Sequence, residues 1–341
     1  MANKKTDLSP GRGLDAGTCF FVSAVKNASG EVLLTKIRDS FIDVPDEPFI
    51  KNTIKMSGAK MLEIGGNFYI IGDESVNFAN LLKREARRPL KDGLISPEEL
   101  AISGDILAAI IKSLLGEPVK PNEVVCYSIP ADPVDNKGVN NIYHTKVLER
   151  LISSAGFRPV PINEAMAIIY AECQDSNFTG LSLSFGGGMV NVCFSYMTMP
   201  ILQFSIQGSG DQIDASVARA LSTTSSRVQI IKEKGVNIMA SDFASKEEEA
   251  IAFYYQTLIE RSVSFVVKEM KNAKVELSDA IPIIIAGGTS LAGGFVEMFQ
   301  KVFDKHKASF PFEVREIRHA SDPLTAVARG LMVAAQLEDS E

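Results

Sequence analysis

The sequence predicts an α/β fold of two similar halves, and three observations predict it. A glycine-rich segment at residues 13–18 (GLDAGT) opens the fold and leads into an apolar strand. A partial repeat at residues 183–189 (LSFGGGM) stands near the midpoint, again between apolar segments. Strands and helices then follow each segment in the same order. Two facing glycine hairpins can hold a polyphosphate from both sides, because glycine lets backbone N–H groups approach the oxygens closely.

Length and composition favour a globular protein of two domains. The 341 residues exceed what one hydrophobic core usually supports. Apolar residues make up 45% of the chain and charged residues 23%, which is ordinary for a globular protein. The net charge of −7 argues against a nucleic-acid partner, since phosphate backbones are bound by basic surfaces. The short basic segment at residues 83–88 is interpreted as a solvated face.

Cysteine, histidine and terminal patterns exclude several classes of protein. The four cysteines have no CxxC spacing and are expected to be reduced, and the three histidines lack the spacing of zinc ligands. Residues 1–7 carry lysines without the apolar segment of a signal peptide. No apolar run approaches the roughly 18 residues of a membrane span. We therefore expect a cytoplasmic protein without an intrinsic membrane anchor.

The first half predicts strands followed by alternating helices and strands. Turn residues 27–30 separate apolar strands at 20–25 and 31–34, which is a hairpin pattern. Residues 61–71 predict a second hairpin that turns at Gly65-Gly66, followed by a polar, partly exposed stretch over 74–96. Next come a helix from Ser96 to Gly116, a buried strand over 124–129 and a helix that closes at Gly156.

The second half repeats this order. Strands through Leu183, Val192 and 201–204 precede helices over 211–221 and 245–271. A continuous apolar strand then covers residues 281–286 and runs into a third glycine site, which precedes a helix over 296–302. The last helix runs from Pro323 to about Leu337.

Two of the glycine sites suggest how parts of a nucleotide could be held. Asp15 lies where the first strand bends, and a carboxylate beside a phosphate cradle can hold Mg²⁺ through its waters. The alternative is a turn aspartate that accepts hydrogen bonds from nearby backbone N–H groups. The third site, residues 286–295, has the order strand, Gly-Gly, helix, which lets the backbone approach a base or ribose.

These motifs together resemble the prokaryotic branch of the actin superfamily, which includes MreB, MamK, FtsA, ParM, DnaK-type chaperones and sugar kinases. The matching motifs are the first phosphate loop at 14–18, the second at 184–189, the adenosine loop at 286–290, the connecting helix at 163–167 and the closing helix at 322–330. Residues 69–74, 88–93 and 208–214 also resemble this branch, closest to MreB and MamK. The resemblance spans about residues 11–337.

The resemblance implies an actin-like, duplicated ribonuclease-H-like fold of two domains with a nucleotide cleft between them. Domain I would cover residues 1–160, with a small subdomain at about 35–95. Domain II would cover 161–320, with a small subdomain at about 207–280, and residues 321–341 would form a closing helix that returns to domain I. The implied cofactors are ATP or ADP with Mg²⁺. The implied partner is the chain itself, in a homopolymeric filament with nucleotide-regulated assembly, and no adaptor protein is identified.

Family roles carry over to matching positions of this chain. Glu164 would orient the attacking water, and Asp15 would hold the metal. The implied nucleotide-contact residues are Gly13, Asp15, Ala16, Gly17, Thr18, Gly186, Gly187, Gly188, Met189, Gly210, Asp211, Lys232, Gly287, Gly288, Thr289 and Ser290. Gln229, together with Lys232, would supply the helix that contacts the adenosine.

The second phosphate loop departs from the family pattern Asp-x-Gly-x-Gly-Thr-Thr. Ser184 replaces the aspartate, and Met189 and Val190 replace the threonines. In the connecting helix Ala165 stands where proline is usual, while the glutamate remains. Losing a supporting metal contact commonly costs about 10- to 100-fold in metal affinity or activity. The three glycines keep the backbone cradle, so we expect a nucleotide-binding protein that is a weak ATPase with slow hydrolysis.

Three other functions stay open at this point. A non-polymerising, nucleotide-binding scaffold similar to FtsA or PilM is favoured by the altered second loop and disfavoured by the missing amphipathic tail. A sugar kinase would need a general base near an acceptor and usually a longer chain. A DnaK-type chaperone would need a substrate domain after the closing helix.

Overall fold

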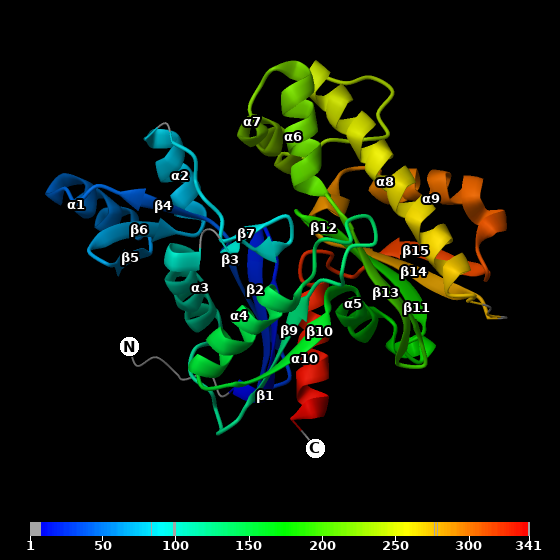
Figure 1. Ribbon diagram of the computed structural model, residues 1–341, viewed down its shortest axis with the longest axis horizontal. Coiled ribbons are helices and arrows are strands. Elements are labelled where there is room, and N and C mark those ends of the chain that lie inside the picture. Colours follow the sequence, from blue (N-terminus) through cyan, green and yellow to red (C-terminus); the bar gives the residue numbers. More distant parts are fainter. Residues whose placement is uncertain (1–7, 83, 98–99, 276, 278, 340–341) are drawn as a thin grey trace.

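The computed structural model describes residues 8–339 except 83, 98–99, 276 and 278. Two lobes stand on either side of a central pair of helices, and each is built on a five-stranded sheet (Figure 1). The strand order is β10-β9-β1-β2-β3 in the first sheet and β15-β14-β11-β12-β13 in the second. If the strands of each sheet are numbered along the chain, both sheets have the order fifth, fourth, first, second, third. This repeated topology is what an internal duplication predicts.

The first sheet joins an antiparallel meander to two parallel strands. Its strands are β1 (Leu8–Ala16), β2 (Phe20–Asn27), β3 (Val32–Arg38), β9 (Val124–Ile129) and β10 (Arg158–Asn163). β1, β2 and β3 pair antiparallel, while β9 and β10 run parallel to β1. At the β2–β3 turn the Asn27 side chain accepts hydrogen bonds from the backbone of Ser29 and Glu31. The predicted hairpin is confirmed.

A small subdomain extends from the first lobe. It contains β4 (Phe41–Val44), α1 (Pro48–Ser57), β5 (Met61–Ile64), β6 (Asn67–Ile71), α2 (Asp73–Leu81), β7 (Leu90–Lys91) and β8 (Leu94–Ile95). β6 pairs with both β4 and β5, which confirms the hairpin predicted at Gly65-Gly66. No helix was predicted over α1, although Ile50 and Ile54 stand one helical turn apart and pack in the core of the subdomain. Part of the predicted basic segment and of the next helix start, residues 83 and 98–99, lies outside the described residues.

Helices cover both faces of the first sheet. α3 (Leu100–Leu115) and α4 (Ile142–Ser154) bury their apolar sides with Leu14, Phe21 and Tyr127 in one core. α10 (Ala326–Glu338) covers the opposite face, where Ala328 and Met332 pack against Val22 and Ala24. The layered order of helix, sheet and helix confirms the predicted α/β class.

The second lobe has the same layers with longer helices. Its strands are β11 (Gly180–Phe185), β12 (Met189–Tyr196), β13 (Met199–Gln207), β14 (Ile281–Ala286) and β15 (Val314–His319). Its helices are α6 (Gly210–Leu221), α7 (Ser225–Glu233), α8 (Lys246–Asn272) and α9 (Phe295–His306), with short 3₁₀ turns η2 (Gln174–Ser176), η3 (Gly288–Leu291) and η4 (Lys307–Ser309). The core includes edge-to-face packing of Phe185 on Phe295 and Phe299, with ring centroids 4.9 and 6.4 Å apart.

The two lobes meet through helices α5 (Glu164–Glu172) and α10, which cross at the base of the cleft (Figure 1). Gly330 allows this close crossing, because a Cβ there would collide with the Ala167 carbonyl of α5. α10 begins at Ala326, three residues later than predicted. Residues 322–325 instead form a turn in which the Thr325 hydroxyl donates to Asp322 at 2.7 Å.

Two strands of the five-stranded sheets escaped prediction, and both lie at sheet edges. β10 contains Pro159 and Pro161, which an edge strand tolerates because its outer N–H groups need no partner. β15 is mostly charged, with Arg315, Glu316 and Arg318, and so lacks an apolar alternation to recognise. Over the described part of the chain, no helix has both the length and the apolar character needed to cross a membrane.

Candidate nucleotide site between the lobes

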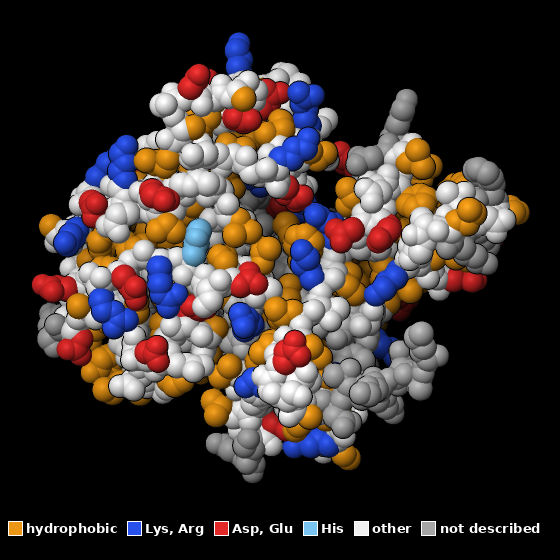
Figure 2. Space-filling view, turned by 180° about the vertical axis from the view of Figure 1, so that it is seen from behind, with side chains coloured by type: hydrophobic (Ala, Val, Ile, Leu, Met, Phe, Trp, Pro, Cys, Tyr) orange, Lys and Arg blue, Asp and Glu red, His pale blue; other side chains and the backbone are white. Residues whose placement is uncertain are grey.

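A cavity of about 410 Å³ lies between the lobes and is lined by residues from both. This volume falls within the range of about 300–1,000 Å³ that is typical of small-molecule sites. Figure 2, seen from behind, shows the notch that separates the upper parts of the two lobes, with charged side chains near its base. The cavity is where all three predicted glycine sites meet.

The first glycine loop joins β1 to β2 through a tight turn. The Gly17 amide donates to the Phe20 carbonyl at 3.2 Å, and a Cβ on Gly17 would lie 2.8 Å from that oxygen. Asp15, Gly17 and Thr18, three of the predicted nucleotide-contact residues, line the cavity. Cys19 and Phe20, which the sequence analysis did not single out, line it as well.

The second glycine loop faces the first across the cavity. A Cβ on Gly187 would lie 2.7 Å from Cys19 Sγ of the first loop, and one on Gly188 would collide with the backbone at Gly93. The carbonyls of Gly186 and Gly187 are occupied within the protein, since they accept from the first amides of α6 at 3.3 and 2.9 Å. Within the described residues, the amides of Gly187 and Gly188 donate no hydrogen bond. Free amides between two close-set glycine loops are suited to an anion.

The third glycine site is tied to the second. Gly287 has a φ of 94°, and a Cβ there would collide with the Phe185 carbonyl at the end of β11. The Thr289 hydroxyl donates to the Gly186 carbonyl at 2.7 Å, which fixes the two segments together. Gly287, Gly288 and Thr289, which were predicted to contact the nucleotide, line the cavity.

Three of the predicted nucleotide-contact residues do not line the cavity. A side chain on Gly13 would collide with the Ala328 carbonyl, so this glycine allows β1 to pack closely against α10. The Ala16 amide donates a hydrogen bond to Ser128 Oγ at 2.7 Å. Ser290 is fully buried and donates to the Gly287 carbonyl at 2.8 Å. These contacts make the three residues part of the support behind the cavity wall.

The other predicted residues of the second lobe line the cavity together. They are Gly186, Gly187, Gly188, Met189, Gly210, Asp211 and Lys232. Lys232 Nζ donates to the Gly210 carbonyl and to Asp214 Oδ2, both at 2.8 Å, and its side chain is largely buried. Burial raises the pKa of Asp214 to about 6, although the charge of Lys232 acts in the opposite direction. Asp214 was not assigned to the site from the sequence.

Asp15 and Glu164 form an acidic pair on the cavity wall. Ser128 Oγ donates to Asp15 Oδ1 at 2.9 Å, and Asn191 Nδ2 donates to Glu164 Oε2 at 3.0 Å. Asn163 caps α5 by accepting from the amides of Ala165 and Met166, and this cap places Glu164 at the first helical position. Burial raises the pKa of Asp15 to about 6, and burial followed by the charge of Asp15 raises the pKa of Glu164 to about 8.

The structure shows the surroundings of Ser184 and Met189, the second-loop residues that depart from the family pattern. Ser184 is buried and lines the cavity at the position where the family pattern has an aspartate. The Met189 side chain extends toward the β7–β8 turn, because a Cβ on Gly93 would lie 2.8 Å from Met189 Cγ. Ser205 Oγ lies 3.5 Å from its sulfur. The loop therefore has a thioether where the family pattern has a threonine hydroxyl.

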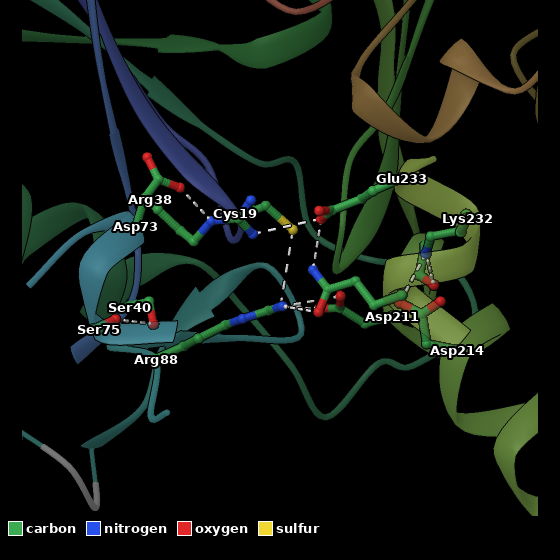
Figure 3. A network of polar contacts seen from close by, with 12 residues as sticks. Cys19, Arg38, Ser40, Asp73, Ser75, Arg88, Asp211, Asp214, Lys232 and Glu233 are labelled. Atoms are coloured by element: carbon green, nitrogen blue, oxygen red, sulfur yellow. Dashed lines mark hydrogen bonds and ion pairs between the residues drawn. The ribbon is translucent and has the colours of Figure 1, made fainter. Parts of the chain in front are cut away.

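Several cavity-lining residues were missed from the sequence because they come from distant segments. Lys36 and Arg38 stand on β3 opposite Val22 and Phe20 of β2, and both cations lie over the Phe20 ring at 4.4 and 4.5 Å. The strand predicted over residues 31–34 ended before both residues, whereas β3 continues to Arg38. Glu233 of α7 was also missed, and it completes this side of the cavity together with Gln229, which the sequence analysis named. Figure 3 shows the contact between Arg38 and Glu233.

Comparisons with known proteins agree with this architecture. The structural match to a MamK double helical filament covers 95% of this chain and 98% of the MamK chain, with a TM-score of 0.65 and 17% sequence identity. MreB5 of Spiroplasma citri bound to ADP covers 97% of both chains, with a TM-score of 0.64 and 16% identity. The ethanolamine utilization protein EutJ from Carboxydothermus hydrogenoformans covers 97% of this chain and 93% of its own, with a TM-score of 0.56 and 16% identity.

These similarities confirm the predicted actin-like α/β fold, since each match covers nearly all of this chain and nearly all of the matched chain. A search of curated protein sequences finds no match. The family model described as Volactin matches residues 11–335. The chain therefore belongs to the Volactin family.

Proposed function

We propose that this chain is an ATP-binding actin-like protein that polymerises into filaments under the control of its nucleotide. One observation carries the proposal: two glycine loops from different lobes face each other across a single cavity, with free amides on the second loop. Solved structures of the same fold support it. They include MreB5 of Spiroplasma citri bound to ADP and to AMPPNP, a MamK filament, and a non-polymerising MamK mutant bound to AMPPNP.

The cavity offers each part of a nucleotide a suitable surface. The amides of the two glycine loops would bind the phosphates. Gly287, Gly288 and Thr289 would contact the adenosine from one side, with Lys232 and Gln229 of α7 on the other. This division follows from position, because the phosphate loops lie between the lobes while the third site lies beside α7.

The acidic side of the cavity fits Mg²⁺. Asp15 and Glu164 present carboxyl oxygens, which are the hard donors that magnesium prefers, and the charge of the ion would favour their ionised forms. Within the described residues, no group of three or more His, Cys, Asp or Glu side chains is placed to hold a metal ion. Asp15 would therefore share the ion with water and with the phosphates. When bound, Mg²⁺ would neutralise charge on the phosphate chain.

Hydrolysis would depend on Glu164 and would be slow. Its carboxyl accepts a hydrogen bond from Asn191 and lines the cavity, so it would be available to orient a water for attack on the terminal phosphate. Ser184 and Met189 supply neither the carboxylate nor the hydroxyl of the family pattern. We therefore assign the chain a weak ATPase activity that is secondary to nucleotide binding.

Electron microscopy of negatively stained protein tests polymerisation directly. Samples would contain ATP with Mg²⁺, ADP with Mg²⁺, or no nucleotide, each over a range of salt and protein concentrations. We expect filaments with ATP and fewer or shorter ones without it. Binding of ATP without filaments under any of these conditions would contradict the polymerisation part of the proposal.

A further inference from the structure

A chain of polar side chains links the two lobes beside the cavity (Figure 3). We call it the cross-cleft network; its members are Asp73, Arg38, Glu233, Gln229, Arg88 and Asp211. Arg38 donates to Asp73 at 2.8 Å and to Glu233 at 3.5 Å, and Gln229 donates to Glu233 at 2.9 Å. Arg88 donates to Gln229 at 3.3 Å and to both carboxylate oxygens of Asp211 at 3.1 Å.

The network passes from one lobe to the other three times. Arg38 ends β3, Asp73 begins α2 and Arg88 precedes β7, so all three belong to the first lobe. Their partners belong to the second lobe, with Asp211 on α6 and Gln229 and Glu233 on α7. The contacts Arg38–Glu233, Arg88–Gln229 and Arg88–Asp211 therefore span the cleft.

The network lies at the rim of the cavity. Arg38, Asp211, Gln229 and Glu233 line the cavity. The same side chains also reach solvent, with exposed fractions of 16% for Arg38, 31% for Asp211 and 47% for Glu233. Arg88 is 26% exposed and is not among the residues that line the cavity, but its Nη1 also lies 3.8 Å from Sγ of Cys19, which does line it.

The lobes are joined differently on another side of the cleft. There the segment after β9 forms backbone hydrogen bonds with β13, from Val134 to Ser205 at 3.0 Å and from Ser205 to Asp132 at 3.2 Å. Arg261 of α8 also pairs with Asp135. Backbone pairing gives this side a fixed joint, whereas the rim near α7 is held by side chains that can separate.

We propose that Arg88, with Arg38, is a positioning residue that holds α6 and α7 closed over a bound nucleotide and so sets its residence time. This inference rests on the proposed function, since it takes the cavity to be the nucleotide site. Charge-assisted hydrogen bonds that are partly shielded from water are stronger than those of fully exposed pairs. Because a bound molecule must pass the rim to leave, losing the network would raise the dissociation rate more than it lowers the association rate.

Stopped-flow release of a fluorescent ATP analogue from the full chain, with Mg²⁺ present, tests this role. We expect Arg88→Gln to release the analogue about five- to tenfold faster, and Arg88→Gln/Arg38→Gln to release it faster still. Arg88→Lys keeps the charge and should restore much of the retention. Arg84→Gln is the matched control, because Arg84 pairs with Asp43 at 2.7 Å within the first lobe and should leave release unchanged.

Two further measurements separate positioning from a general loss of structure. Asp73→Asn changes the most exposed member of the network, which does not line the cavity, and should accelerate release by about twofold while the melting temperature stays unchanged. Raising the salt from about 0.1 to 1 M shortens the screening length from about 10 to 3 Å. Release should therefore depend more steeply on salt in the natural protein than in the double arginine variant.

The outcomes distinguish this inference from the function on which it rests. If the natural protein retains no nucleotide, the proposed function fails first. If it retains nucleotide and Arg88→Gln releases it at the natural rate with the natural salt dependence, the positioning role is overturned while the proposed function stands. Faster release by Arg88→Gln together with an unchanged Arg84→Gln supports the positioning role.

Discussion

At the scale of single residues, the glycines of the candidate site are required by what lies opposite them. Gly187 faces Cys19 across the cleft, and Gly188 faces the backbone at Gly93. Neither neighbour is near in sequence, so the requirement for glycine arises only when the lobes close. The glycine-rich pattern predicted a loop at these positions, and the structure shows that a Cβ at either position would collide with the neighbour opposite it.

A larger side chain at Gly187 should hold the two loops apart. We expect Gly187→Val to weaken ATP binding by more than about tenfold, because its side chain would occupy the space beside Cys19 Sγ. Isothermal titration with ATP and Mg²⁺ measures this change. Gly138→Ala is a suitable control, since a Cβ there meets no atom closer than 3.6 Å. Natural affinity in Gly187→Val would show that the nucleotide does not bind between these loops.

His144, which does not line the cavity, makes stability depend on pH. It is almost fully buried, its Nδ1 accepts from the Ile95 amide at 3.2 Å, and burial lowers its pKa to about 4. Between about pH 6.5 and pH 4 the unfolded chain binds a proton here that the folded chain does not, so this group destabilises the fold as the pH falls. The full effect is about 3 kcal/mol.

His144→Asn should reduce that dependence. Asparagine can still accept the Ile95 hydrogen bond, but it does not titrate in this range. Denaturant unfolding of both proteins at pH 7.5, 6, 5 and 4 measures their free energies of unfolding. The difference between the two proteins isolates His144, because the buried carboxyls contribute equally to the pH dependence of each. An identical loss of stability on acidification in the two proteins would contradict the assignment to His144.

At the scale of secondary-structure elements, a buried ion pair joins β1 to the start of β9. Arg12 Nε lies 2.7 Å from Glu123 Oε1, and both side chains are almost fully buried. Arg12 also donates to the Leu115 and Glu117 carbonyls, and Glu123 accepts from the Val119 amide at 2.7 Å. The pair thus anchors the end of α3 to two neighbouring strands.

Breaking this pair should be costly, because it leaves a buried charge without its partner. We expect Glu123→Gln to lower the free energy of unfolding by about 3–5 kcal/mol. Lys146→Gln, which removes an exposed pair with Glu149 on α4, should change it by less than about 1 kcal/mol. Chemical denaturation measures both, and equal small effects would show that the Arg12–Glu123 pair is not needed for stability.

Elements with a strong local signal were predictable, and those defined by distant contacts were not. The β14 strand is apolar throughout and ends in Gly287-Gly288, so its position and its turn were both clear from the sequence. β10, with its two prolines, depends on pairing with β9 and carries no comparable signal. Gly13 shows a further limit: its motif predicted a nucleotide contact, whereas its close neighbour is α10, more than 300 positions later.

At the scale of the whole molecule, the two lobes form one cavity from segments spread over the entire chain. The repeated glycine hairpins predicted a two-sided grip, and the repeated sheet order agrees with it. The rim of the cavity was not predictable, because Arg38 and Glu233 are 195 positions apart and neither belongs to a motif. Relative placement of the lobes, which no local pattern encodes, decides which charges meet.

The central claim is that a nucleotide binds between the two glycine loops. A crystal structure of the protein with AMPPNP and Mg²⁺ tests it most directly. The account predicts density for the phosphates between Gly17-Thr18 and Gly187-Gly188, with the adenosine beside Gly287-Thr289. Nucleotide density outside this cavity, or a cavity that stays free of nucleotide at millimolar AMPPNP, would contradict it.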